Sequence, residues 1–380
     1  MLKKETAPTA VQHLDLPEGV PPLTALYMYI SGSCNLACRH CWIEPDYQTD
    51  NKTGKFIKLE QVKKAIVEAK PLGLQSVKLT GGEPMLHPHF REIVDLIDGE
   101  NIAIVMETNG TLIDDELAVY LKSKKNFGFI SVSIDGARAE THDKLRGIEG
   151  AFNKAISGIK SLVKAGFHPQ LICTLHKGNS AEMEDVVNLA DLSGCSSVKF
   201  NLIQHMGRGD DFAKKNGFEI NEITELFLVL EDEIHPKYKI KVYFDIPIAF
   251  KPIRNLLKND IGRCSVLNIL SIISDGSISI CGIGVTIPEL LFGHITDDNL
   301  RDIWLTSPKL INLREEIPEK LEGICGLCIH RDTCLGSCVA NNFHTSKKFS
   351  SAFYFCEQAD KSGIFPSSRK HYLRQEGDKL

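Results

Sequence analysis

The chain contains 380 residues, 43% of them apolar, and this length favours one large domain with a smaller one over a single core. Its formal net charge of -5, with Lys and Arg scattered along the chain, excludes a broad basic surface for nucleic acid. No apolar run reaches about eighteen residues and no signal-like N-terminus is present, so we expect a cytoplasmic protein without membrane segments. Residues 1–23, rich in proline and polar side chains, are expected to form an extended lead-in.

The first predicted strand, residues 24–30, leads into a loop with Cys34, Cys38 and Cys41 at a C-x3-C-x2-C spacing. In a reducing compartment such cysteines are more often metal ligands than disulfide partners. Three thiolates suit three irons of a cubane cluster and leave the fourth iron open. A zinc ion is the alternative, and it would need a fourth ligand such as His40.

The second predicted strand, residues 76–80, runs into Gly81, Gly82 and Glu83. Adjacent glycines permit positive φ and a close approach of the backbone to a ligand, and Glu83 adds a carboxylate at the end of the strand. A GGEP sequence alone is a common turn composition. Together with the sequence CNLACRHC, however, it resembles the radical S-adenosylmethionine (SAM) enzymes.

In that family the three cysteines hold a 4Fe-4S cluster, and the amino and carboxyl groups of SAM chelate its open iron. The resemblance therefore implies that the three loop cysteines are cluster ligands. It also implies that Gly81, Gly82 and Glu83 bind the SAM amino group. His40 occupies a position, usually aromatic in the family, against the adenine.

Strands and helices alternate through the first half of the chain. Helices are predicted over residues 59–70, 87–96, 114–122, 150–165 and 181–192, and further strands over 102–107, 129–135, 169–175 and 197–202. This alternation calls for parallel strands with helical crossovers, in an α/β fold that is either an open sheet or an incomplete barrel. The resemblance implies a partial (β/α)6 barrel over residues 24–203, with cluster and SAM at the C-terminal ends of the strands.

Two further residues match family positions near SAM. Ser133 resembles a residue that contacts the ribose, and Arg146 resembles an arginine that reaches the carboxylate. The alternatives are a strand-end hydroxyl and a helix-surface charge, respectively. Asn109 and Asp135 are expected only to shape their turns.

Residues 204–263 are interpreted as a bridging region. The segment 203–219, where the barrel passes into this region, is rich in glycine and charge, which predicts a loop above the barrel that contacts substrate. A helix over 223–234 and a strand over 239–246 follow.

The C-terminal region, residues 264–356, contains seven cysteines, and zinc would leave three of them unused because it takes ligands in fours. Their order resembles the SPASM extension of peptide-modifying radical SAM enzymes, which carries two auxiliary 4Fe-4S clusters. The ligands implied for the first auxiliary cluster are Cys264, Cys281 and Cys338, and those for the second are Cys325, Cys328, Cys334 and Cys356. The eighth cysteine of some relatives is missing, so the first auxiliary cluster has either an open iron or a ligand such as Asp260. Residues 357–380 are expected to be an exposed polar tail.

Two cysteines, Cys173 and Cys195, have no partner at ligand spacing and are expected to be core thiols. They therefore enter neither the implied SAM site nor the auxiliary clusters.

The resemblance implies an enzyme with three 4Fe-4S clusters that cleaves SAM to a 5'-deoxyadenosyl radical and takes hydrogen from a ribosomally made peptide. The product would be a crosslink, an epimer or an excised segment. Implied partners are the precursor peptide, an electron donor such as flavodoxin or ferredoxin, and a separate leader-binding protein. One alternative is a sulfatase-maturing enzyme, but Gly282 stands where those enzymes carry an aspartate base. The other is a non-enzymatic zinc scaffold.

Overall fold

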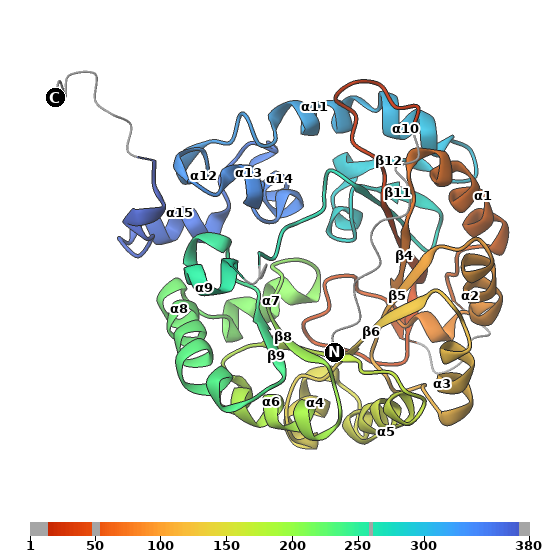
Figure 1. The fold of residues 1–380 in the computed structure, drawn as a ribbon, viewed down its shortest axis with the longest axis horizontal. Coiled ribbons are helices and arrows are strands. Elements are labelled where there is room, and N and C mark those ends of the chain that lie inside the picture. Colours follow the sequence, from red (N-terminus) through yellow and green to blue (C-terminus); the bar gives the residue numbers. More distant parts are fainter. Residues whose placement is uncertain (1–13, 48–53, 258–260, 372–380) are drawn as a thin grey trace.

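The computed structural model describes residues 14–47, 54–257 and 261–371. A ten-stranded sheet runs through the molecule in the order β12-β11-β10-β1-β4-β5-β6-β7-β8-β9. It curves around an interior, with helices on its outer side, as Figure 1 shows. None of the helices in these ranges is long and apolar enough to cross a membrane.

Six parallel strands and their crossover helices form the predicted partial barrel. The strands are β1 (Ala25–Ser31), β4 (Ser76–Gly81), β5 (Ala103–Thr108), β6 (Phe127–Ser133), β7 (Gln170–Leu175) and β8 (Ser197–Leu202). The helices are α1 (Leu59–Ala69), α2 (Phe90–Gly99), α3 (Asp115–Lys122), α4 (Ala139–Arg146), α5 (Ala151–Lys164) and α6 (Met183–Leu192). Neighbouring strands pair in parallel, because each crossover helix returns the chain to the same end of the sheet. The strand ends that carry the predicted SAM residues therefore meet at one edge.

Later segments extend this sheet at both sides. β9 (Lys241–Phe244) adds to β8 in parallel, and β10 (Ile269–Ile272) adds to β1 in parallel. β11 (Ser277–Ser279) and β12 (Leu291–His294) continue from β10 as antiparallel strands. The C-terminal region thus shares its first strands with the barrel.

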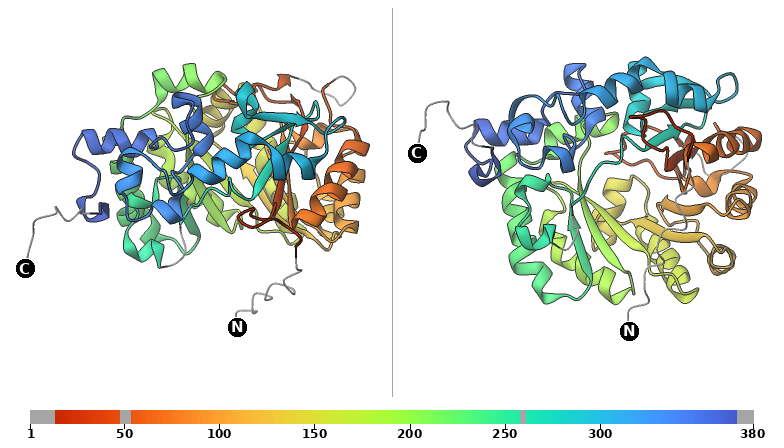
Figure 2. Two further views of the ribbon diagram at one scale, coloured as in Figure 1. Left: turned by 90° about the horizontal axis from the view of Figure 1, so that it is seen from above. Right: turned by 45° about the horizontal axis from the view of Figure 1, so that its top comes forward.

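The C-terminal helices line one side of the barrel, in the blue part of Figures 1 and 2. They are α10 (Leu300–Thr306), α11 (Pro308–Glu316), α12 (Gly323–Leu327), α13 (Arg331–Cys334), α14 (Val339–Ser346) and α15 (Tyr354–Lys361). One buried apolar cluster joins barrel side chains such as Leu79 and Met106 to Trp304 and Phe349 of this region. Trp304 Nε1 also donates to the carbonyl oxygen of Pro21 at 3.0 Å, which fixes the end of the lead-in.

The predicted loop over residues 203–219 is wrong in part, because α7 (Arg208–Asn216) lies within it. Gly207 has φ +53°, and a Cβ there would lie 2.7 Å from the carbonyl oxygen of Trp42. This glycine lets α7 begin directly against the cysteine loop, and a contact so distant in sequence gives no local signal. α8 (Ile220–Val229) follows, and a turn of π-helix continues it over Leu230–Ile234. The structure also forms α9 (Ile253–Leu256).

The expectation of an exposed C-terminal tail is wrong for residues 357–371. Ala359 and Phe365 are buried, and the Phe365 ring lies 5.7 Å from the ring of Phe250. These few apolar side chains anchor a segment whose overall composition is polar. Residues 372–380 lie outside the described residues.

Candidate active site

The cysteine loop begins where β1 ends at the barrel edge. β2 (Ser33–Cys34) pairs with β3 (Asp46–Tyr47), so the loop closes on itself. The Cys34 and Cys38 side chains are buried and that of Cys41 is half-buried. Burial raises the pKa of the Cys34 thiol to about 12, and the negative charges of Glu83, Cys38 and Cys41 add to the shift. The three sulfurs therefore lie close enough for their charges to interact. A metal cluster that binds their thiolates would stabilise the site.

A cavity of about 240 Å³ opens beside this loop. Its walls include the three loop cysteines, His40, Gly81, Gly82, Ser133 and Arg146. The structure thus brings together every residue predicted for the SAM cluster and SAM, with one exception.

The exception is Glu83, which does not line the cavity. Its carboxylate is fully buried and accepts hydrogen bonds from Thr108 Oγ1 at 2.8 Å and the backbone N–H of Asn109 at 2.9 Å. Burial outweighs these hydrogen bonds and raises the pKa of Glu83 to about 7. Glu83 therefore ties the end of β4 to the end of β5, and its carboxylate faces Thr108 and Asn109 instead of the cavity.

The two glycines of the turn are required by the backbone around them. Gly81 has φ +143°, and a Cβ there or at Gly82 would overlap the carbonyl oxygen of Ser31 or Ser33, respectively. The Gly82 N–H donates to the Ser31 oxygen at 2.7 Å. The glycines thus let β4 approach the cysteine loop and leave one wall of the cavity as bare backbone.

Arg146 and Asp135 form a buried ion pair, with Nε of the guanidinium 2.6 Å from Oδ2 of the carboxylate. Arg146 Nη1 also donates to Cys38 Sγ at 3.6 Å, and His40 Nε2 lies 3.8 Å from the same carboxylate oxygen. Burial acts to raise the pKa of Asp135, but the charges of Arg146 and the nearby histidines lower it overall. Arg146 is therefore not a surface charge, and Asp135 does more than shape its turn.

Asn109 holds the cysteine loop from the end of β5. Its Nδ2 donates to Asn35 Oδ1 at 2.8 Å and lies 3.8 Å from Cys34 Sγ. The sequence assigned it only to a turn, although its place directly after a strand, in the sequence TNG, is a signal for a residue at this edge.

The seven C-terminal cysteines separate into the two predicted groups. In the first group, burial raises the pKa of Cys338, and the charges of Cys281 and Cys264 raise it further. In the second, burial raises the pKa of Cys356, and the added charges are those of Cys325, Cys334 and Cys328. The cysteines of each group therefore lie close to one another in the folded protein. Asp260, the candidate extra ligand, lies outside the described residues.

The donor chemistry of these sites fits iron-sulfur clusters. Among the described residues, no three His, Cys, Asp or Glu side chains converge on a position for one metal ion. A cubane does not need such a group, because each cysteine ligates a different iron. The loop site offers three thiolates with an adjoining cavity, and His40 Nδ1 is buried there without a hydrogen-bond partner.

Comparison with known proteins gives the family. Residues 28–190 match the Radical SAM superfamily, and residues 264–329 match the SPASM iron-sulfur cluster-binding domain. An AdoMet-dependent heme synthase of Methanosarcina barkeri is 29% identical, over 81% of this chain and 88% of that protein. Mycofactocin maturase MftC of Mycobacterium ulcerans is 26% identical, over 89% of each chain.

Solved structures show the same fold. SuiB of Streptococcus suis bound to precursor peptide SuiA superposes with a TM-score of 0.70 at 18% identity, covering 89% of this chain and 76% of that one. The structure of native anSMEcpe with bound AdoMet gives a TM-score of 0.67 at 20% identity, covering 90% of this chain and 95% of that one. The sequence matches imply 4Fe-4S clusters and SAM as cofactors. This chain is therefore an enzyme of the radical SAM superfamily that carries a C-terminal SPASM domain.

Proposed function

We propose that this enzyme modifies a ribosomally made precursor peptide. The observation that carries the proposal is the combination of two gathered C-terminal cysteine groups with a chain of cavities that reaches the SAM-side cysteines. Similarity to mycofactocin maturase MftC supports a peptide substrate. When bound, the cluster and SAM would supply the 5'-deoxyadenosyl radical chemistry that takes hydrogen from an unactivated C–H bond.

In this proposal the protein's own residues bind the clusters and orient SAM. Cys34, Cys38 and Cys41 hold the SAM cluster, while the bare backbone at Gly81 and Gly82 admits the SAM amino group. His40 lies against the adenine and Ser133 contacts the ribose. The two C-terminal groups hold one auxiliary cluster each, which gives three clusters per chain.

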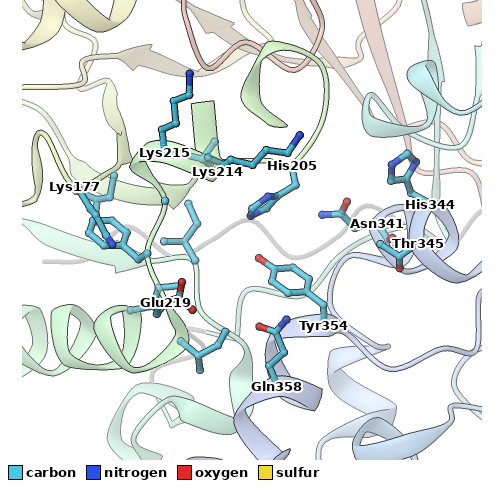
Figure 3. A pocket seen from close by; sticks show the side chains of 18 residues that line it. Lys177, His205, Lys214, Lys215, Glu219, Asn341, His344, Thr345, Tyr354 and Gln358 are labelled. Atoms are coloured by element: carbon cyan, nitrogen blue, oxygen red, sulfur yellow. Dashed lines mark hydrogen bonds between the residues drawn. The ribbon is translucent and has the colours of Figure 1, made fainter. Parts of the chain in front are cut away.

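Three adjoining cavities form a route for an extended substrate. The outer one, of about 510 Å³, lies between the barrel and the C-terminal helices; Figure 3 shows Lys215 and His205 on one side and Tyr354 on the other. It shares Leu202 and Tyr354 with a middle cavity of about 500 Å³ beside Cys264 and Cys338. Leu202 also lines the SAM-side cavity. A peptide, longer than any of these cavities alone, suits such a route.

The structure argues against formylglycine formation. A side chain at Gly282 would overlap the hydroxyl of Tyr29, and its Cβ would lie 2.6 Å from the indole of Trp42. The position of the sulfatase-maturing base is therefore filled by other side chains, and an aspartate could not be restored there without displacing Tyr29.

Tetrapyrroles form a second candidate substrate class. The similarity to heme synthases of Methanosarcina barkeri and Oleidesulfovibrio alaskensis favours them, because it spans more than four fifths of this chain. The lysines and histidines of the outer cavity would suit the carboxylates of such molecules as well as acidic peptide side chains.

The test begins with protein reconstituted without air. We expect about twelve irons per chain for three 4Fe-4S clusters, and 5'-deoxyadenosine after reduction with dithionite or flavodoxin. Co-expression with small peptides encoded nearby should give a mass change in one of them, and a pull-down should retain any separate leader-binding protein. Modification of a porphyrin but of no peptide would replace the peptide proposal. A colourless zinc protein that leaves SAM intact would end both.

A further inference from the structure

Lys199 lies in the middle of β8, on the inner face of the barrel. Its neighbours in the strand, Val198 and Phe200, are fully buried in the apolar core, and successive side chains of a strand point to opposite faces. Ser197, on the same face as Lys199, accepts a hydrogen bond from Gln170 Nε2 of β7 at 3.0 Å. The half-buried lysine thus belongs to the polar inner face and lines the middle cavity of about 500 Å³.

The ammonium group of Lys199 has no partner among the described residues. Another lysine of the barrel strands, Lys78, is paired with Glu107 at 3.1 Å and lies 3.9 Å from the centre of the Tyr27 ring. Asp245, a carboxylate of the same cavity lining, does not pair with Lys199. Because lysines inside proteins are rarely left unpaired, the counter-charge of Lys199 is expected from a ligand.

Lys199 also lies close to the place where the middle cavity meets the SAM-side cavity. Leu202, Gln204 and Asp245 line both cavities. Asn201, the next residue of β8 on the face of Lys199, lines the SAM-side cavity. Residues two apart in a strand are separated by about 6.6 Å. A group bound at Lys199 is therefore about one such step away from the space beside the cysteine loop.

We propose that Lys199 binds a carboxylate of the substrate, and that the reacting C–H bond lies on the part of the substrate next to this carboxylate. Lys199 is then a binding residue that selects substrates by charge, and the partial shielding of the cavity makes this ion pair stronger than an exposed one. A peptide carboxylate and a tetrapyrrole propionate offer the same chemistry, so the test separates the two sources. The inference rests on the proposed function in one respect, since it requires that the middle cavity holds the substrate.

The test uses pairs of ligands that differ in their carboxylates. Coproporphyrin III is paired with its tetramethyl ester. A library of decapeptides with Asp, Glu and a free C-terminus is paired with one that has Asn, Gln and a C-terminal amide in their place.

Binding of each ligand is measured by equilibrium dialysis without air, on reconstituted protein that is loaded with SAM. The proteins are wild type, Lys199→Gln, Lys199→Arg and the control Lys160→Gln, which changes an exposed lysine of α5. Iron content and SAM affinity are measured for each protein, so that damage to the SAM site is distinguished from loss of the carboxylate contact.

We expect the wild type to bind the acidic member of one pair more tightly than the neutral member. Lys199→Gln should weaken binding of the acidic member about 10- to 100-fold, the range for a hydrogen-bonded charge, and leave the affinity for the neutral member within about threefold of wild type. Lys199→Arg should retain part of the preference for the acidic member, and Lys160→Gln should retain all of it.

Absence of this preference in the wild type, or an equal loss for both members of a pair in Lys199→Gln, overturns the proposal. So does a shift in the midpoint potential of a cluster in Lys199→Gln with unchanged ligand affinities, since the lysine would then compensate cluster charge. The proposed function fails separately. Binding of coproporphyrin III through Lys199 without binding of any peptide ends the peptide proposal alone, whereas peptide binding that ignores carboxylates ends only the role of Lys199.

Discussion

The SAM-side cysteine loop and the last cysteine group differ in what surrounds their sulfurs. At the loop, side chains reach the thiolates: Arg146 Nη1 donates to Cys38, and Asn109 Nδ2 lies 3.8 Å from Cys34. The cavity beside them measures about 240 Å³. The loop is therefore polar, charged and open to a ligand.

The last group is closed and apolar. Backbone N–H groups reach its sulfurs, from Phe353 to Cys325 and from His330 to Cys328, each at 3.4 Å. The adjoining space is only about 20 Å³. Under the proposed function this difference gives one ligand type two uses: a cluster at the loop would exchange ligands, and a cluster at the last group would exchange only electrons.

The largest expected difference between the two sites follows from removing a thiolate of the cysteine loop. In Cys38→Ala we expect SAM cleavage to disappear, because the cluster loses one of its three ligands, while iron falls from about twelve to about eight per chain. 5'-Deoxyadenosine and iron are measured on the same sample. Cys195→Ala is the control, since this half-buried thiol is in neither group. Loss of all iron in Cys38→Ala would show that the sites are not independent.

The polar character of the loop site depends on its buried ion pair. Arg146→Met leaves Asp135 buried without its partner, which should lower the free energy of unfolding by about 3–5 kcal/mol. Anaerobic urea unfolding measures this change. The double variant Arg146→Met/Asp135→Asn should recover part of the loss, because it removes both charges. A double variant as unstable as the sum of its parts would contradict the coupling.

The apolar character of the last group depends on aromatic packing. The Phe250 ring lies 5.0 Å from Phe355 and 5.7 Å from Phe365. Phe365→Leu should destabilise the protein by about 1–2 kcal/mol without reducing SAM cleavage. Phe129→Leu, at an exposed position on β6, should change stability by less than about 0.5 kcal/mol. Equal losses of stability in the two variants would mean that the packing of Phe365 does not stabilise the last cysteine group.

The smallest expected effect concerns pH at the loop site. The pKa of Glu83 is raised from 4.5 to about 7, so the folded state holds its proton more tightly than the unfolded state does. Stability from this group is full below pH 4.5 and is lost as pH rises to about 7. Between pH 6 and 8 the wild type should lose about 1 kcal/mol more than Glu83→Gln in anaerobic unfolding. Parallel pH profiles for the two proteins would refute this.

Local patterns predicted most of the barrel and the shared site of the loop cysteines, because strands and helices follow the period of their own apolar residues and the loop cysteines are close in sequence. The division of the C-terminal cysteines was implied by the resemblance and not by spacing, since Cys334 and Cys338 are near in sequence but belong to different groups. The ion pair of Arg146 with Asp135 was not predicted, because it depends on how α4 packs against the end of β6. α7 was missed for a similar reason: its charged sequence is stabilised by contacts of Gly207 with the cysteine loop. Glu83 was placed in the right turn, but its direction is set by Thr108 and Asn109 on the next strand.

The pairing of β10 with β1 has a consequence for synthesis of the chain. β1 ends at Ser31 and leaves the ribosome long before the strand that covers its outer edge, which begins only at residue 269. Until then a strand with buried Leu26, Met28 and Ile30 presents unpaired backbone groups, which is a template for aggregation. A protein truncated near residue 263 would retain that bare edge permanently, so the barrel alone is a poor unit for recombinant expression.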